Sequence, residues 1–487
     1  MTNPIRVRFA PSPTGYLHVG GARSALFNYL FAKHHQGTFI LRIEDTDRTR
    51  FVEGALTEIY ESLKWLGISW DEGPDVEGEC GPYTQSERVE LYRSHAEQLL
   101  KSGNAYRCFC TAERLAEMRK EQEKTKIKVG YDRHCCFLTK EEVQQRLGSD
   151  DPFVIRFKIP EARTIRFIDA IRGAIEYKSD VLDDFVLLKT DGFPTYHLAN
   201  VVDDHLMAIS HVLRGDEWIA STPRHILLYE AFGWNVPQFA HLPIILAEGG
   251  GKLSKRKGAA SVMDYKKAGY LPEALMNFLA LLGWAPGGDR EKMSFEELIH
   301  LFSLEQVSPK ASVFDEKKLE WMNGIYLAEQ SVTRLVSEVV PLLQEEGIIP
   351  IGETDIDYLS QVIELLRTRS KKLTDLVEAA RYFYCDPDSY EEKGIRKYFS
   401  EDAADRLDAL RRSIGECNEF IAEKLEALFR TAAESMGVGF GKLIHPVRLA
   451  VSGVTFGPGL FELLAVLGKD RVLARIEKAI HFIKQNK

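Results

Sequence analysis

The segment at residues 5–21, IRVRFAPSPTGYLHVGG, decides the fold of this chain. Apolar residues alternate with arginines over 5–10, and this period of two predicts a β-strand. Prolines and a glycine at 11–15 end the strand in a turn, and after Gly20 the apolar residues recur at helical spacing. A second strand, predicted at 38–43, completes a strand–helix–strand unit. Its ligand crevice is expected at the carboxyl end of the first strand.

The residues after the first strand suit a nucleoside triphosphate. Gly20 and Gly21 have no Cβ, so a base or a ribose can approach their backbone closely. A helix N-terminus attracts phosphate oxygens, and His18 can donate a hydrogen bond to an oxygen whose charge grows in a transition state. The alternative is a tight turn with an incidental histidine, because a short motif on its own is weak evidence.

A second basic cluster, KLSKRKG at residues 252–258, lies far downstream and follows three glycines at 249–251. It places four cations in six residues. A loop with this charge and flanking glycines suits closure over pyrophosphate. The alternative is a solvated basic loop that contacts RNA backbone or nothing at all.

Together these strings resemble the signature motifs of the class I aminoacyl-tRNA synthetases. HVGG at 18–21 resembles the family's HIGH box, and KLSKR at 252–256 resembles its KMSKS loop. A glycine stands where the first motif often has a second histidine, and an arginine replaces the final serine of the second. Longer strings, RFAPSPTG at 8–15 and RIEDTD at 42–47, look like those of bacterial glutamyl-tRNA synthetases of the discriminating type. The resemblance covers the whole chain.

The resemblance implies ATP-dependent ligation of L-glutamate to the 3′-terminal adenosine of tRNA(Glu) through a glutamyl adenylate, with Mg²⁺ accompanying ATP. It assigns catalysis to His18, Gly20, Lys252, Ser254, Lys255 and Arg256. It assigns ATP binding to His18, Gly20, Gly21 and Lys255. It assigns the glutamate pocket to Arg8, Ser12, Glu44, Tyr196, Asn200 and Arg214. In this family activation usually waits for bound tRNA.

The chemistry of these residues fits an acidic amino acid. An arginine offers two parallel donors to a carboxylate, and Arg8 and Arg214 are the candidates. Glu44 is placed to hold the α-ammonium group. Tyr196 and Asn200 lie four residues apart, so on a helix they share one face.

Several of these acidic and basic residues also have ordinary structural explanations. For the two arginines the alternative is surface ion pairing. Asp45 and Asp47 suit helix capping better than metal binding. Asp203 and Asp204 either contact RNA or cap a helix.

Four of the seven cysteines cluster at positions 108, 110, 135 and 136. The chain begins without an apolar signal run, so reduced thiols are expected, and thiolates suit the tetrahedral preference of zinc. Some members of the resembled family hold zinc here with Cys-x-Cys and a later Tyr-x-x-x-Cys. The resemblance therefore implies a structural zinc held by Cys108, Cys110, Tyr131 and Cys135. His134 and Cys136 are rival ligands, and buried free thiols without metal are the alternative.

The expected fold class is α/β, with a Rossmann-like parallel-sheet catalytic domain, an inserted α+β domain and all-α anticodon-binding domains. The catalytic domain is expected at 1–92 and 186–248, and the inserted acceptor-binding domain at 93–185. A stem-contact domain carrying the KMSKS-like loop follows at 249–328. Apolar residues at helical spacing, with few glycines and prolines, predict helical domains at 329–390 and 391–487.

A basic run in the first helical domain, RTRSKK at 367–372, places four cations in six residues, and on a helix several of them would share a face. The resemblance identifies Arg369 with the arginine that selects cytosine at the third anticodon base, as bidentate recognition of a base edge allows. It therefore predicts that glutamine tRNAs are rejected. The alternative is a solvated basic face.

Composition sets the remaining limits. A net charge of −9 does not exclude RNA binding, because local basic patches set the contact field. No stretch approaches the about 18 apolar residues of a membrane span, and we expect a cytoplasmic monomer.

Two rival functions are a shortened paralogue that attaches glutamate to a modified tRNA base, which lacks the helical part, and a synthetase scaffold with lost chemistry. His18, Lys255 and Arg256 argue against the second.

Overall fold

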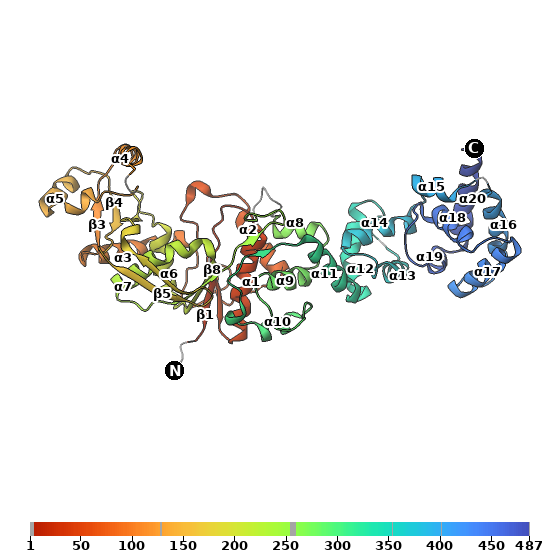
Figure 1. Ribbon diagram of the computed structural model, residues 1–487, viewed down its shortest axis with the longest axis horizontal. Helices are drawn as coiled ribbons and strands as arrows, with labels where there is room; N and C mark the ends of the chain where they lie inside the picture. The colour runs from red at the N-terminus through yellow and green to blue at the C-terminus, as the bar shows by residue number, and fades with distance from the viewer. Residues whose placement is uncertain (1–3, 127–128, 254–259, 353, 401, 487) are drawn as a thin grey trace. The chain divides into compact units, whose positions relative to one another are not determined.

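A computed structural model of the chain describes residues 4–126, 129–253, 260–352, 354–400 and 402–486. Ser254, Lys255 and Arg256, which were predicted to be catalytic, lie outside the described residues. The chain divides into two compact units (Figure 1). The first comprises Met1–Asp264 and Leu275–Asp315, and the second Tyr265–Ala274 and Glu316–Lys487.

The first unit begins with the predicted strand–helix–strand unit. β1 (Arg6–Phe9) leads through a turn into α1 (Val19–His34), which is followed by β2 (Thr38–Leu41). β1 and β2 pair in parallel, with Arg8 opposite Ile40. Apolar side chains of α1 are buried on most of its circumference, so the helix lies in the core and its first turn is fixed beside the end of β1.

A second parallel pair continues the α/β arrangement. β8 (His211–Gly215) pairs with β9 (Gln238–Leu242), and α7 (Thr222–Phe232) connects them. Just before β8, the Ser210 N–H donates to the Arg6 carbonyl at 2.9 Å, which joins this pair to β1. The helix α6 (Tyr196–Leu206) precedes β8. The predicted α/β class with parallel strands is confirmed.

Between these parts the chain forms smaller antiparallel elements. β4 (Val154–Phe157) lies between β3 (Ala105–Cys108) and β7 (Val186–Leu188) in a three-stranded sheet. β5 (Thr164–Asp169) and β6 (Gly173–Lys178) form a hairpin, and β5 also pairs in parallel with β9. The strands of the two sheets therefore alternate along the chain, and both sheets contain strands from each side of residue 185, where the sequence predicted a domain boundary.

Further helices complete the first unit. They are α2 (Ala55–Trp65), α3 (Val89–Lys101), α4 (Ala112–Lys124), α5 (Lys140–Gly148) and α10 (Phe295–Leu301). A short parallel pair joins β10 (Ile245–Leu246) to β11 (Ser312–Val313). The chain passes between the units in α8 (Val262–Lys267) and α9 (Pro272–Leu281).

The rest of the second unit is built of helices in its described residues, as predicted (Figure 1). They are α11 (Glu316–Glu329), α12 (Val332–Glu345), α13 (Ile356–Leu366), α14 (Leu373–Tyr384), α15 (Glu392–Tyr398), α16 (Ala403–Gly415), α17 (Ala422–Ser435), α18 (Gly441–Ser452), α19 (Leu460–Leu467) and α20 (Lys469–Gln485). None of the helices in the described ranges combines the length and apolar content that a membrane crossing requires.

One local prediction in this unit is wrong. The basic run 367–372 is not helical but forms the turn between α13 and α14. The carboxylate of Asp375 accepts hydrogen bonds from the backbone N–H groups of Lys371 and Lys372, at 2.9 and 3.0 Å. This cap starts a new helix at Leu373, so the cations of the run do not share a helix face.

Candidate active site

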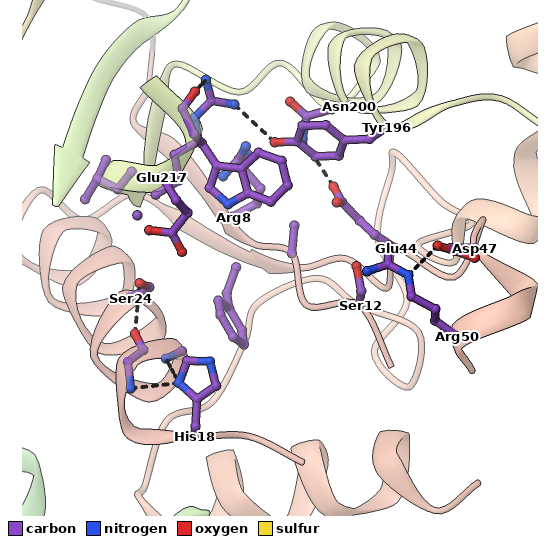
Figure 2. Close-up of a pocket in the computed structure, with 18 of the residues that line it drawn as sticks. Arg8, Ser12, His18, Ser24, Glu44, Asp47, Arg50, Tyr196, Asn200 and Glu217 are labelled. Carbon is purple, nitrogen blue, oxygen red and sulfur yellow. Dashed lines mark hydrogen bonds and ion pairs between the residues drawn. The ribbon is translucent and has the colours of Figure 1, made fainter. Parts of the chain in front are cut away.

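A cavity of about 670 Å³ opens where β1 and β8 end and α1 begins (Figure 2). This is the crevice that parallel α/β sheets offer at the carboxyl ends of their strands. Every predicted substrate-site residue that the structure describes lines it: Arg8, Ser12, His18, Gly20, Gly21, Glu44, Tyr196, Asn200, Arg214 and Lys252. The sequence motifs, far apart along the chain, therefore meet in one cavity.

His18 caps the helix that faces the cavity. Its Nδ1 accepts hydrogen bonds from the backbone N–H groups of Gly20 and Gly21, at 3.1 and 3.2 Å (Figure 2). A neutral imidazole that accepts at Nδ1 carries its proton on Nε2. The cap thus fixes the tautomer and makes Nε2 the hydrogen-bond donor of this exposed side chain.

The chain on both sides of residues 254–259 is hydrogen-bonded to the cavity wall. Before the gap, the Leu253 N–H donates to the Ile245 carbonyl at 2.9 Å. After it, the Val262 N–H donates to the Leu17 carbonyl at 2.9 Å, directly next to His18. Leu253 and Val262, the described residues near the two ends of the second motif, are therefore both hydrogen-bonded to segments next to the cavity.

Arg23, which the sequence did not single out, also lines the cavity. Its guanidinium donates to the carbonyls of Leu282 and Pro243, so it ties α1 to two connecting segments. Burial lowers the pKa of Arg23 to about 10. A lone arginine within the apolar helix pattern was the available signal.

A buried ion network lies behind Arg8. The Asp204 carboxylate accepts two hydrogen bonds from Arg8, at 2.9 and 3.2 Å, and one from Arg42 at 2.8 Å. Arg8 and Asp204 are 3% and 2% exposed, and Arg42 is fully buried. The bidentate pair holds the guanidinium of Arg8 in one orientation and gives it a carboxylate partner, which it shares with Arg42.

The neighbouring Asp203 anchors a second set of donors. It accepts from Arg88 at 2.7 Å, from Gln85 at 2.8 Å and from the hydroxyl of Tyr92 at 2.8 Å. Both aspartates are thus buried ion-pair partners on α6, and neither has the RNA-contact or capping role considered from the sequence. The surface pairing considered for Arg8 is also wrong, because the pair is buried.

Glu44 brings a carboxylate to the cavity from the end of β2. One oxygen accepts from Arg42 at 3.1 Å and from the Asn200 amide at 3.2 Å. Burial raises the pKa of Glu44, against the opposing effect of Arg42. The second oxygen of this carboxylate remains for a cationic group in the cavity.

Arg214, at the end of β8, is held by neutral groups. It donates to the Tyr196 hydroxyl at 3.1 Å and to the Thr222 hydroxyl at 2.7 Å, and imidazoles complete its surroundings. No ion pair in the described part of the chain involves it. A buried guanidinium without a carboxylate partner suits an anionic ligand.

Comparison with known proteins assigns the family. The chain matches the family "tRNA synthetases class I (E and Q), catalytic domain" over residues 4–321 and "Anticodon binding domain" over residues 332–480. It is 48% identical over 487 residues to the glutamate–tRNA ligase of Moorella thermoacetica, with 99% of each chain covered. The chain belongs to the glutamate–tRNA ligases of class I. This confirms the family predicted from the sequence motifs.

Further relatives agree. The glutamate–tRNA ligase of Dehalococcoides mccartyi strain 195 is 48% identical over 483 residues, which cover 99% of this chain and 98% of that one. A crystal structure of a glutamate tRNA ligase from Elizabethkingia meningosepticum in complex with its amino acid superposes with a TM-score of 0.92 at 39% identity. It covers 99% of this chain and 100% of the other.

In this glutamate–tRNA ligase the predicted zinc ligands also come together. The sulfurs of Cys108, Cys110 and Cys135 lie within 4.8 Å of one another, and the Tyr131 hydroxyl is 3.3 Å from Cys108 Sγ and 3.5 Å from Cys110 Sγ. Hydrogen bonds from Cys135 and Tyr131 lower the pKa of the Cys108 thiol to about 4. Three convergent sulfurs and a tyrosine hydroxyl oxygen fit a tetrahedral zinc ion.

The rival ligands stand apart from this cluster. His134 is exposed, and Cys136 is not among the grouped donors. All seven cysteines are free, so no disulfide competes for the thiols.

The predicted anticodon residue lies at the surface of the helical unit. Arg369 is exposed on the turn between α13 and α14. Burial and then the positive charge of Arg369 lower the pKa of the nearby Arg448. Two cations thus lie close together on one face of a glutamate–tRNA ligase, within its anticodon-binding part.

Proposed function

We propose that this chain activates L-glutamate with ATP and transfers it to the 3′-terminal adenosine of tRNA(Glu). Family membership supports ATP-dependent attachment of glutamate to tRNA. The observation that carries the substrate assignment is the cavity itself, where unpaired Arg214 and the carboxylate of Glu44 face the same space. This charge pair complements an amino acid with a second carboxylate.

The glutamate site follows from these contacts. Tyr196 accepts from Arg214, so its own proton is available to the γ-carboxylate of the substrate, beside the guanidinium charge. Burial raises the pKa of Tyr196, which keeps that proton in place. Glu44, steadied by Asn200, takes the α-ammonium group. Arg8 and Ser12 contact the remaining polar atoms, and the α-carboxylate is left to react.

The ATP site lies at the start of α1. The backbone of Gly20 and Gly21 allows a close approach by the nucleotide, and His18 Nε2 donates to phosphate oxygens. The negative charge that develops on the leaving pyrophosphate is stabilised by the second motif, through Lys252, Ser254, Lys255 and Arg256. Mg²⁺ would accompany ATP, held mostly by phosphates and water.

The reaction needs no covalent enzyme nucleophile. The glutamate α-carboxylate attacks the α-phosphorus of ATP and releases pyrophosphate, and the 2′-hydroxyl of the terminal adenosine then attacks the activated carbonyl and releases AMP. The chain contributes alignment and charge complementarity. Activation before tRNA binds is expected to be slow.

The other parts of the chain serve tRNA binding. The inserted segment 93–185 holds the acceptor end, steadied by zinc on the four donors of the cysteine cluster, and 249–328 contacts the stem. The helical parts 329–390 and 391–487 grip the anticodon arm, with Arg369 selecting cytosine. The chain works as a cytoplasmic monomer. Less than about 0.2 zinc per purified chain by elemental analysis would remove the metal from this proposal.

The deciding experiment is a tRNA-dependent ATP–pyrophosphate exchange assay, followed by aminoacylation of separated glutamate and glutamine tRNAs with each amino acid. We expect exchange with glutamate and charging of tRNA(Glu) alone. No exchange would support a scaffold with lost chemistry. Efficient charging of glutamine tRNAs would refute the discriminating type.

A further inference from the structure

The two arginines of the cavity differ in what holds them. Arg8 is paired with the Asp204 carboxylate through two hydrogen bonds. Among the described residues the Arg214 side chain donates five hydrogen bonds, and each acceptor is neutral or a backbone carbonyl. They are His241 Nε2 at 3.1 Å, the Tyr196 hydroxyl at 3.1 Å, His225 Nδ1 at 3.2 Å, the Trp218 carbonyl at 3.3 Å and the Thr222 hydroxyl at 2.7 Å.

The tautomer of His241 is set from behind. Its Nδ1 lies 2.6 Å from the Asp169 carboxylate, which also accepts from the backbone N–H groups of Ile171 and Arg172. The carboxylate therefore accepts a hydrogen bond from Nδ1–H, and Nε2 is left as an acceptor aimed at Arg214 Nε. His241 is fully buried and Asp169 is 1% exposed, so water does not compete for these bonds.

His225 is oriented in the same sense by a second imidazole. Its Nδ1 faces Arg214, and its Nε2 lies 3.1 Å from Nδ1 of His197. A nitrogen that accepts from a guanidinium cannot carry the proton, so the proton of His225 is on Nε2 and is donated to His197. Burial lowers the pKa of His225 and of His241, which keeps both rings neutral.

We propose that His225 and His241 are positioning residues that determine the preference of the site for an acidic substrate, because they fix the Arg214 guanidinium without balancing its charge. This inference rests on the proposed function. Neither histidine lines the cavity, so both act through Arg214. A carboxylate in place of either imidazole would hold the guanidinium as firmly, but would neutralise it, as Asp204 neutralises Arg8.

The chain offers a matched test at His225. In His225→Gln the amide oxygen accepts from Arg214 and the NH₂ group donates to His197, which reproduces both bonds. His225→Glu has the same size but adds a negative charge beside the guanidinium. We expect the glutamine variant to keep the glutamate KM within about threefold of the wild type. We expect the glutamate variant to raise it at least about tenfold and to lose discrimination against glutamine by a similar factor.

The assays are glutamate and glutamine activation in the full chain with tRNA, each with ATP KM as an internal reference that should stay within about twofold. His205→Gln is the control, because His205 is exposed on α6 and stacks on Trp234. Thermal melts check folding. If His225→Glu fails to fold, His225→Leu replaces it, since leucine accepts no bond, and its glutamate KM should exceed that of His225→Gln at least about fivefold.

The results separate the two proposals. The positioning role of His225 would be overturned if His225→Gln and His225→Glu had the same glutamate KM and the same discrimination against glutamine. It would also be overturned if His225→Gln and His225→Leu had the same glutamate KM. A wild type and His205→Gln that activate no glutamate would overturn the proposed function, and this inference with it.

Discussion

Replacing Asp204 by asparagine should weaken glutamate binding without touching the cavity directly. The Oδ1 of Asp204 accepts from Arg8 Nε at 2.9 Å and from Arg42 Nη1 at 2.8 Å, and an amide oxygen can keep both bonds. Its Oδ2 accepts from Arg8 Nη2 at 3.2 Å. In Asp204→Asn this atom becomes an NH₂ group that faces another donor, so Arg8 loses the second arm of its bidentate pair and turns.

The expected size follows from this loss. A hydrogen bond to a charged group is worth about 1.5–3 kcal/mol, and each 1.36 kcal/mol is a factor of ten. The glutamate KM should therefore rise about 10- to 100-fold, while the ATP KM changes less than about twofold. A loss of the same order in folding stability accompanies it, because the network is buried.

Pyrophosphate exchange with tRNA present, at varied glutamate and then at varied ATP, measures this split. Glu176→Gln is the control, because Glu176 pairs with Arg166 at 2.8 Å on an exposed hairpin, where such pairs are worth about 0–1 kcal/mol. The positioning role of the network would be refuted if thermal melting showed Asp204→Asn to be folded and its glutamate KM stayed within about twofold of the wild type.

Three further outcomes are expected. Gly20→Ala places a methyl carbon 3.0 Å from His18 Cε1 and displaces the His18 side chain that caps α1. The kcat for exchange should therefore fall about 10- to 100-fold, with a smaller change in glutamate KM. An unchanged kcat would argue against a catalytic role of His18. As the pH falls, the Glu44 carboxyl, whose pKa burial raises, gains a proton and stops attracting the α-ammonium, so glutamate KM should rise; Glu44→Gln should lack this limb of the profile. Arg369→Gln should increase charging of a glutamine tRNA at least about fivefold in aminoacylation assays, and continued rejection would remove its selective role.

The sequence predicted what depends on local pattern. The alternation before the prolines and the helical spacing after Gly20 are properties of neighbouring residues, and β1 and α1 follow them closely. The helical second unit follows for the same reason. The spacing of Cys108, Cys110, Tyr131 and Cys135 also predicted a cluster that the structure assembles.

The sequence did not predict what depends on which face of an element is buried. Asp203 and Asp204 are adjacent on α6, yet they accept hydrogen bonds from different arginines, which come from other segments of the chain. No spacing rule predicts these partners. The histidines behind Arg214 come from α7 and β9 and carry no motif. The basic run at 367–372 had helical spacing, but the cap by Asp375 is a side-chain contact that periodicity does not register.

In the proposed site, selection of glutamate over glutamine depends on a difference between the two cavity arginines: Arg8 has a carboxylate partner and Arg214 has none. Glutamine has almost the same size and shape as glutamate, so packing alone discriminates poorly. Arg214 is 6% exposed and Glu44 is 8% exposed, so each charge is nearly removed from water. Under the proposed function, glutamate would supply a carboxylate for Arg214 and an ammonium group for Glu44, whereas glutamine would leave the guanidinium without a carboxylate. An uncompensated buried charge costs about 3–5 kcal/mol, which is more than a hundredfold in binding. Arg8 already has a carboxylate partner in Asp204, so in the proposed site it would orient the substrate but add little to this discrimination.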